Sequence, residues 1–322
     1  MDKIGTMVMS RKDVKVFDCT IRDGGLVNNF QFEDEFVKGV YDTCVKAGVD
    51  YMEIGKNNSP TIQSPKEFGK WNFCLESDIR KIVGKNNTNL KIAVMSDIGR
   101  TVKEELKPKK ESVVDMVRIA AYMHQIPSAI ELIEDAHKKG YETTINIMAI
   151  SKAMNDELDE VLDELSKTPV NIIYLVDSFG SFHPEQINKL AKKYTKIAKN
   201  SNKLVGVHAH NNMQLAYANT IEAMMYGASV LDVTISGLGR GAGNCPMELI
   251  VGFLKNPKYK LMPILKFIEH YIVPLEKKLD WGYSVPYMLT GQLNEHPRTA
   301  MKARDDADIN FCDQYRTLLD TQ

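Results

Sequence analysis

Two histidines separated by a single residue form the most chemically informative pattern in this chain of 322 residues. His208 and His210 follow a short apolar run, and alternate residues of a strand point to the same face. Two imidazoles on one face can share a divalent metal ion when a carboxylate completes the ligand set. Asp23, in a polar loop after the first apolar run, would reach that ion if the strands close into a barrel. The pattern predicts a metal site with three protein ligands and open positions for water or substrate.

The elements that must position these residues alternate between two patterns. Eight short apolar, β-branched runs recur about every 20 to 45 residues, which is the spacing of strands that alternate with helices. Amphipathic stretches between them are typical of helices, and Gly48, Gly140 and Gly227 follow three of these stretches as helix C-caps do. The predicted strands are residues 14–19, 49–54, 90–95, 113–119, 143–148, 171–176, 204–207 and 230–235. The predicted helices include residues 32–47, 128–139, 156–167, 184–199 and 213–226.

Such a chain can form a closed (β/α)8 TIM barrel or an open doubly wound sheet. The open sheet would require a glycine-rich turn after the first strand. Residues 19–24 instead form a polar, charged loop, which favours the barrel. We expect an α/β fold: a TIM-barrel catalytic domain over residues 1–255 and a C-terminal helical extension over residues 256–322. Within the extension, residues 263–280 and 297–320 are predicted to be helical.

The composition excludes several classes of protein. Hydrophobic residues make up 43% of the chain, charged residues 26%, and the net charge is −1, which gives no electrostatic footprint for nucleic acid. No apolar run approaches the roughly 20 residues of a membrane span. The five cysteines are scattered without a Cys-x-x-Cys pair, so neither a disulfide framework nor a structural zinc site is expected. We expect a cytoplasmic protein without a signal peptide.

Polar side chains follow every predicted strand at its carboxyl end, where TIM barrels hold their active sites. These residues are Arg22, Asp23, Glu53, Ser96, Asp97, Arg118, Asn146, Asp177, Ser178, His208, His210 and a glycine-rich loop at 237–244. Arg118, Asn146 and Asp177 are predicted to bind substrate. An alternative for Asn146 and Asp177, together with Asp97, is that they hydrogen-bond the imidazoles and fix their orientation.

Three motifs resemble the signature set of the DRE-TIM metallolyases. They are Asp-Cys-Thr-Ile-Arg-Asp-Gly at residues 18–24, His-Ala-His-Asn at residues 208–211 and Gly-Leu-Gly-Arg-Gly-Ala-Gly-Asn at residues 237–244. That superfamily includes 4-hydroxy-2-oxovalerate aldolase, 3-hydroxy-3-methylglutaryl-CoA lyase, and the isopropylmalate and homocitrate synthases. The resemblance covers roughly residues 14–255, and three motifs in this order at the ends of the corresponding strands are highly specific together.

The resemblance implies roles for individual residues. Asp23, His208 and His210 match the metal ligands of the family, and Asn244 matches an asparagine that binds the metal or supports its ligands. Arg22 matches the arginine that stabilises the enolate of a 2-oxo acid or of the equivalent thioester. Elementary chemistry agrees, because cleaving a C–C bond beside a carbonyl leaves negative charge on oxygen, which a metal ion and a guanidinium stabilise.

Within the superfamily, the chain looks most similar to the 4-hydroxy-2-oxovalerate aldolases. Pro246 and Glu248 follow the glycine loop as in that branch, and residues 282–287 resemble its Gly-Tyr-x-x-x-Tyr motif. Tyr287 is therefore a candidate catalytic acid, base or hydroxyl-orienting residue, with packing against the barrel as the alternative. One position departs from the pattern. Those aldolases have a histidine base three residues after the metal-binding aspartate, where this chain has Leu26.

The motifs therefore do not identify the general base. Glu53, His124, His183 and His296 are the alternatives, although each of these histidines could also be an ordinary surface or helix-capping residue. Glu53 is treated as a catalytic candidate, and it could equally be a partner of the loop residues. Cys245 follows the glycine loop and is expected to be structural.

Together, the residues and the resemblance predict a metal-dependent carbon–carbon lyase. The expected reaction is cleavage or formation of a C–C bond in a 4-hydroxy-2-oxo acid, with pyruvate or a close 2-oxo acid as one product. A Claisen condensation of an acyl-CoA with a 2-oxo acid is the alternative. Two other possibilities are an iron(II) oxygenase with the same ligand types and a catalytically altered barrel that serves as a partner subunit.

The expected cofactor is Mn²⁺ or Mg²⁺, with Co²⁺ and Zn²⁺ as alternatives. The expected partner is a small 2-oxo acid, with no nucleic acid and no membrane. The C-terminal extension and the family resemblance suggest a homo-oligomer. An aldehyde dehydrogenase is a candidate partner, although the sequence does not say whether one docks on the C-terminal helices. The aldehyde part of the substrate and the stereochemistry are not specified by these patterns.

Overall fold

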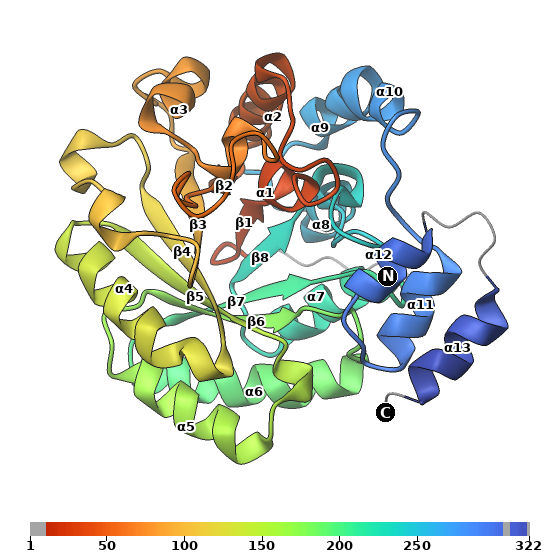
Figure 1. Ribbon diagram of the computed structural model, residues 1–322. Coiled ribbons are helices and arrows are strands. Elements are labelled where there is room, and N and C mark those ends of the chain that lie inside the picture. The colour runs from red at the N-terminus through yellow and green to blue at the C-terminus, as the bar shows by residue number, and fades with distance from the viewer. Residues whose placement is uncertain (1–10, 305–309, 321–322) are drawn as a thin grey trace, which may run out of the picture.

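Eight parallel strands form one closed barrel, as the sequence predicts (Figure 1). The computed structural model describes residues 11–304 and 310–320. The strands follow chain order around the barrel, and β1 pairs with β8 to close it. They are β1 Lys15–Asp18, β2 Tyr51–Lys56, β3 Lys91–Asp97, β4 Met116–Tyr122, β5 Glu142–Met148, β6 Ile172–Asp177, β7 Leu204–Ala209 and β8 Val230–Val233.

Helices surround the barrel and end where the sequence places glycine. Gly48, Gly140 and Gly227 all have positive φ angles, a conformation that glycine adopts without strain, and Gly48 is the C-cap of α2. The α-helices are α1 Thr20–Gly24, α2 Asp34–Ala47, α3 Glu76–Val83, α4 Ile126–Lys138, α5 Asn155–Ser166, α6 Pro184–Asn200, α7 Ala216–Met225, α8 Met247–Leu254, α9 Leu261–Phe267, α10 Val273–Leu275, α11 Val285–Gln292, α12 Arg298–Arg304 and α13 Phe311–Leu319.

The C-terminal region differs in detail from the prediction. The region predicted to be helical over 263–280 contains the end of α9, a π-helical turn at Ile268–Ile272 and α10, which ends at Leu275. The segment predicted over 297–320 contains two helices, α12 and α13, and residues 305–309 lie outside the described residues. Helix α11 was not predicted, because its mixed composition carries no clear helical stripe. Boundaries in such segments depend on tertiary packing more than on local pattern.

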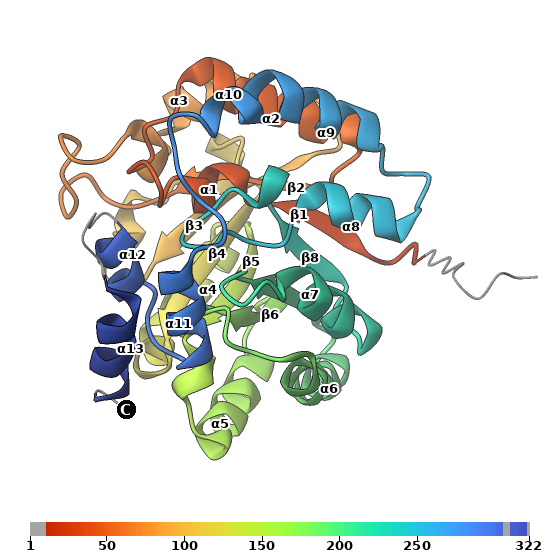
Figure 2. The same ribbon diagram turned by 90° about the vertical axis from the view of Figure 1, so that its right-hand side faces the viewer.

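The C-terminal helices occupy two places on the barrel (Figures 1 and 2). Helix α9 packs against α2, where the rings of Phe36 and Phe267 lie 5.4 Å apart. Helices α11, α12 and α13 form a separate group beside the carboxyl ends of the strands. In the described part of the chain, no helix is long and apolar enough to cross a membrane.

The barrel interior holds an unusual buried cation. The guanidinium of Arg118, on β4, has no exposed surface, and it lies between the rings of Phe17 and Tyr174, 4.3 and 4.4 Å from their centroids. Met116 and Val230 belong to the same interior cluster. These side chains fill the barrel below the carboxyl ends of the strands. Any site at those ends therefore has a closed floor of packed side chains.

Candidate metal centre and active site

Short backbone connections place Asp23 at the carboxyl end of β1. The amide of Asp23 donates to the carbonyl of Cys19, 2.9 Å away, which begins the single turn of α1 directly after the strand. The hydroxyl of Thr20 accepts a hydrogen bond of 2.9 Å from the amide of Ile235, which follows β8. The two ends of the closed sheet are thereby joined beside Asp23. Barrel closure, which the local sequence cannot show, brings this carboxylate next to the last strands.

The two histidines leave β7 on the same face, as their spacing predicts. His208 lies within the strand, and His210 follows it and forms an antiparallel bridge with Asn244 of the glycine loop. A Cβ atom at Gly239 would lie 2.6 Å from Oδ1 of Asn244, so only glycine lets the loop fold over this side chain. The loop thereby holds Asn244 against the histidines.

Asp23, His208 and His210 converge on one point. One ligand atom from each lies within 4.8 Å of the others, and all three side chains are buried. Nε2 of His208 lies 3.1 Å from Oδ2 of Asp23, and the amide nitrogen of Asn244 donates to the same oxygen. The buried Nδ1 of His210 and Oδ1 of Asn244 have no hydrogen-bond partner among the described residues. Buried polar atoms without partners are costly, so this donor set fits a bound cation.

The charge states in the site suit a metal ion. Burial would raise the pKa of Asp23, but Arg22 and the two imidazoles lower it well below its usual range, so the carboxylate is ionised. Burial lowers the pKa of His210 well below that of a free imidazole, which keeps the ring neutral. Ionised carboxylate and neutral imidazole are the forms that bind metals.

A chain of buried charges supports the centre from below. Nδ1 of His208 lies 2.9 Å from Oδ2 of Asp232, and Arg118 donates to that oxygen over 2.6 Å. Arg118 also donates to Glu53 over 3.1 Å, and Glu53 in turn accepts from Nε of Arg22 over 2.7 Å. Arg22 reaches Asp23 with its Nη1, 3.0 Å from Oδ1. The chain therefore runs from one metal-ligand candidate to another through the barrel core.

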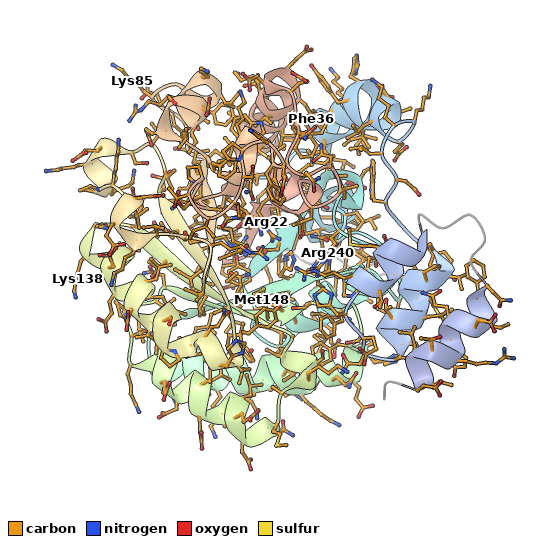
Figure 3. The ribbon with its side chains drawn as sticks, in the orientation of Figure 1. Arg22, Phe36, Lys85, Lys138, Met148 and Arg240 are labelled. Atoms are coloured by element: carbon orange, nitrogen blue, oxygen red, sulfur yellow. The ribbon has the colours of Figure 1, made fainter. Side chains whose placement is uncertain are left out.

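The centre opens into a cavity of about 370 Å³ at the carboxyl ends of the strands. Figure 3 shows Arg22 and Arg240 pointing toward the middle of this end of the barrel. The polar lining is Arg22, Asp23, Lys56, Asp97, Arg100, Tyr122, Gln125, Asn146, Ser178, His208, His210, Arg240, His296 and Arg298. The apolar lining includes Leu26, Met95, Ile98, Ala120, Met148 and Val176. Its volume suits a small substrate.

The residues predicted to act in the site fall into two groups. Arg22 and Asn146 line the cavity with the candidate metal ligands. Arg118 is enclosed in the barrel core, and Glu53 is buried between Arg22 and Arg118. In the described structure, neither Arg118 nor Glu53 lines the cavity, because both lie beneath its floor.

Asp177 and Tyr287 also lie away from the cavity lining in the described structure. Asp177 accepts hydrogen bonds from the backbone amides of Ser181 and Phe182, at 3.0 and 3.2 Å, and burial raises its pKa to about 7. Tyr287 is buried in a small cluster with Ala242 of the glycine loop. These contacts favour a role for Tyr287 in holding that loop.

Several lining residues were not singled out from the sequence. Lys56 ends β2 and forms a buried ion pair of 2.6 Å with Asp97, which ends β3. Tyr122 ends β4, and Arg240 lies within the glycine-rich loop. The signal was available, because side chains at strand ends face the site in this fold. Arg298 had no such signal, since it comes from α12.

The alternatives for a general base are narrowed by the geometry. Leu26 lines the cavity, so the position of the expected base is apolar. His296 lines it too, whereas His124 stacks on Tyr122 at a ring distance of 5.9 Å and His183 caps α6. Among the described histidines outside the metal centre, only His296 therefore faces the site.

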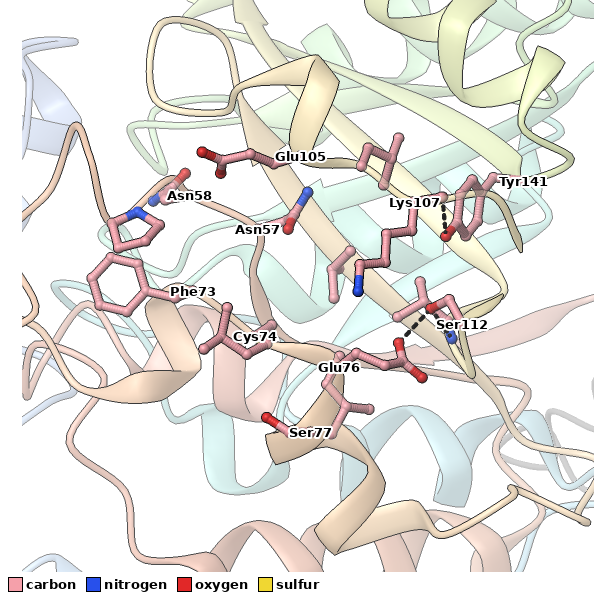
Figure 4. A pocket seen from close by; sticks show the side chains of 16 residues that line it. Asn57, Asn58, Phe73, Cys74, Glu76, Ser77, Glu105, Lys107, Ser112 and Tyr141 are labelled. Atoms are coloured by element: carbon pink, nitrogen blue, oxygen red, sulfur yellow. Dashed lines mark hydrogen bonds between the residues drawn. The ribbon is translucent and has the colours of Figure 1, made fainter. Parts of the chain in front are cut away.

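A second cavity, of about 310 Å³, lies outside the barrel wall (Figure 4). Its polar groups bond to one another: Glu76 accepts from the Ser112 hydroxyl at 2.7 Å, and the Tyr141 hydroxyl donates to the Lys107 carbonyl at 2.9 Å. These bonds join α3 and the start of β5 to the connection between β3 and β4. We assign this cavity to the packing of this connection.

The barrel and its Asp-His-His cluster define a class: TIM-barrel enzymes with a candidate metal centre at the carboxyl ends of the strands. The family model described as HMGL-like matches residues 13–269. The chain belongs to the HMGL-like family, and it is a carbon–carbon lyase.

Individual relatives agree with the family. An oxaloacetate decarboxylase of Mycobacterium tuberculosis is 30% identical over 253 residues, which cover 77% of this chain and 72% of the relative. A 4-hydroxy-2-oxovalerate aldolase of Geobacillus genomosp. 3 is 27% identical over 271 residues, or 83% of this chain and 79% of the relative.

Solved structures show the same fold. The N-terminal domain of a presumed aldolase from Bacteroides vulgatus is 30% identical with a TM-score of 0.75, covering 90% of this chain and 96% of that one. Hydroxymethylglutaryl-CoA lyase from Pseudomonas aeruginosa, 19% identical with a TM-score of 0.65 over 84% of this chain and 95% of that one, shares the fold.

Proposed function

We propose that this lyase uses a divalent metal ion to cleave or form the C3–C4 bond of a 4-hydroxy-2-oxo acid through the enolate of pyruvate. The observation that carries the proposal is the position of Arg22. Its guanidinium lines the cavity and lies beside Asp23, one of three converging candidate ligands. A cation beside a metal site is what a developing enolate oxygen requires.

The residues that would hold the ion are Asp23, His208 and His210, with Asn244 as a further oxygen donor. When bound, the ion supplies Lewis-acid polarisation of the 2-oxo group. The carboxylate and amide oxygens suit Mn²⁺ or Mg²⁺, and the two imidazole nitrogens also admit Co²⁺ and Zn²⁺.

Two carboxylates fix the position of the Arg22 guanidinium in the cavity. Glu53 accepts from its Nε at 2.7 Å and Asp23 lies 3.0 Å from its Nη1, so one edge of the guanidinium is fixed. Burial opposes the charge, yet both carboxylates raise the pKa of Arg22, and the group remains cationic. A guanidinium fixed in this way can bind the substrate carboxylate and stabilise the negative charge that develops on the 2-oxo oxygen.

In retro-aldol cleavage, the C4 hydroxyl loses its proton, C4 becomes an aldehyde carbon, and the electrons of the C3–C4 bond form the enolate. Protonation of C3 then gives pyruvate. The reaction needs an acceptor for the hydroxyl proton, and Leu26 supplies none. The cavity-lining Tyr122 has a hydroxyl that can relay this proton to solvent.

A second candidate reaction is decarboxylation of a 2-oxo dicarboxylate such as oxaloacetate. It breaks the bond to the distal carboxylate, releases CO₂ and leaves the same enolate, but it requires no base. Two observations favour it: the apolar Leu26 and the relative from Mycobacterium tuberculosis that is named oxaloacetate decarboxylase.

Exchange of the pyruvate methyl protons in D₂O, followed by NMR with the Mg²⁺-loaded protein, tests the shared enolate step. We expect exchange that depends on Mg²⁺ and that falls at least tenfold in Arg22→Met. Arg316→Gln, an exposed position on α13, is the control for a lost arginine. Absence of exchange in the metal-loaded wild type would contradict the proposal. Release of CO₂ from oxaloacetate distinguishes the second candidate.

A further inference from the structure

The cavity has an excess of positive charge that the metal centre does not use. Lys56 and Arg100 both pair with Asp97, at 2.6 and 3.3 Å, and Arg22 pairs with Asp23 and Glu53. The other two lining arginines differ from these. Among the described residues, no carboxylate lies within ion-pair distance of the remaining lining arginines, 240 and 298.

Arg240 is the more enclosed of the two arginines. One of its terminal nitrogens, Nη2, donates to the carbonyl of Ser178 at 2.9 Å and lies 3.4 Å from Nε2 of His210. Its Nε is buried without a hydrogen-bond partner among the described residues. A half-buried guanidinium with one buried, unpartnered nitrogen and no paired carboxylate favours an anionic ligand.

His296 adds a hydrogen-bond donor to the same side of the cavity. Its Nδ1 accepts from the backbone amide of Arg298 over 3.1 Å, so in the neutral ring the proton is on Nε2. Burial, Arg240 and Arg298 lower the pKa of His296 to about 4, which keeps it neutral at pH 7. With its acceptor nitrogen occupied, His296 can donate to a ligand but is badly arranged to act as a base.

We propose that Arg240, Arg298 and His296 form a subsite for a second carboxylate, at the end of the substrate opposite its 2-oxo acid group. The inference rests on the proposed function, which places the 2-oxo acid at Arg22 and the metal ligands. The substrate class is then the 4-hydroxy-2-oxo dicarboxylates. The product that is released from this subsite is an aldehyde or ketone that bears a carboxylate.

Arg240 lies 3.4 Å from His210, which places this subsite beside the metal centre, so a chain of about five carbons can reach both. The subsite also favours aldol chemistry over decarboxylation. Two guanidiniums stabilise a distal carboxylate as an anion, whereas decarboxylation must turn it into neutral CO₂.

The substrates that test the subsite differ only at C5. We would compare 4-hydroxy-2-oxopentanoate, which ends in a methyl group, with 4-hydroxy-2-oxopentanedioate, which ends in a carboxylate, using Mg²⁺-loaded protein. We expect kcat/KM to favour the dicarboxylate by about 10- to 100-fold, as charge-assisted hydrogen bonds typically provide. Equal kcat/KM values for the two compounds would overturn the subsite. A preference for an analogue ending in phosphate over the dicarboxylate would overturn the carboxylate assignment.

Variants connect the preference to the named residues. Arg298→Gln, at an exposed position that can be changed without disturbing the core, should reduce the preference several-fold, and Arg240→Gln should reduce it more. His296→Gln retains a donor and should keep most of the preference that His296→Leu loses. The preference should be unchanged in Arg316→Gln, since that arginine pairs with Asp313 on α13. A preference that survives both arginine variants would exclude these residues.

Calorimetric binding of the two compounds separates this inference from the proposed function, because binding needs no turnover. If pyruvate exchange is absent but the wild type binds the dicarboxylate more tightly and Arg298→Gln does not, the proposed function fails and the subsite stands. If exchange is present and the two compounds bind equally, the subsite fails and the proposed function stands.

Discussion

Nδ1 of His208 lies 2.9 Å from Oδ2 of Asp232, while Nε2 of the same ring faces Asp23 at 3.1 Å. A carboxylate behind a metal-binding histidine fixes the orientation of the ring and raises its basicity. Here that carboxylate is itself held by the buried Arg118. The orientation of a candidate ligand at the rim therefore depends on an ion pair inside the barrel.

Asp232→Asn should weaken metal binding by about 10- to 100-fold, the usual effect of removing such a partner. Isothermal titration of the metal-free protein with Mn²⁺ measures it. Asp50→Asn is a matched control, because Asp50 also accepts several hydrogen bonds but lies at the opposite end of the barrel, before β2. Equal Mn²⁺ affinities for wild type and Asp232→Asn would show that the His208–Asp232 contact does not support the metal.

Asp23→Ala and His208→Ala should each lose the bound ion, because two of the three converging ligands, even with the Asn244 oxygen, seldom hold a divalent metal at micromolar concentration. Metal content per chain after dialysis, measured by elemental analysis, is the readout. Asp163→Ala, which removes an exposed carboxylate on α5, controls for a general change in charge. Full metal occupancy in either site variant would remove that residue from the ligand set.

Arg118→Met should lower the free energy of unfolding by about 3 to 5 kcal/mol, because it leaves Glu53 and Asp232 as uncompensated buried charges. Urea unfolding followed by circular dichroism measures the loss. The sequence predicted that Arg118 binds substrate, whereas its buried ion pairs indicate a role in stability. The measurement distinguishes these two roles. A variant that keeps its stability but loses affinity for a 2-oxo acid would support substrate binding instead.

Leu26→His should increase cleavage of 4-hydroxy-2-oxo acids, because it places a base in the cavity where none of the apolar neighbours can accept a proton. General bases typically contribute 10²- to 10⁴-fold, and we expect a gain of at least about tenfold in a site not shaped for one. Leu26→Asn, polar but not basic, is the control. A gain shared by both variants would indicate altered substrate binding rather than proton transfer.

Asp18 should make stability depend on pH. Burial raises the pKa of Asp18 to about 7, so the folded state holds a proton that the unfolded chain releases near pH 4. The stabilisation from this proton is full below about pH 4 and is lost as the pH rises past 7. Asp18→Asn resembles the protonated acid.

Relative to wild type, Asp18→Asn should therefore gain unfolding free energy between pH 5 and pH 8, on the order of 1 to 3 kcal/mol. Denaturant unfolding at the two pH values measures the difference, and Asp163→Asn, an exposed acid, should show almost none. A difference that does not change with pH would mean that Asp18 is ionised throughout.

Much of the fold could be predicted because strand and helix periodicities are local. Each strand-like run overlaps one of the strands β1 to β8, with ends that differ by up to three residues, and the glycines after three helices have the expected positive φ angles. Helix α11 was missed, and the pattern did not give the limits of the two described helices within residues 297–320. Their limits depend on packing against the rest of the chain rather than on a repeating pattern.

The sequence alone determined the candidate metal site, since the type and spacing of His208 and His210 and the motif around Asp23 are properties of short segments. Only the tertiary structure decided which other polar residues meet that site. Arg118, at a strand position like the others, is enclosed in the core, whereas Arg298, far along the chain, lines the cavity. Spacing along the chain sets the face on which a side chain lies, but barrel closure and helix docking set its neighbours.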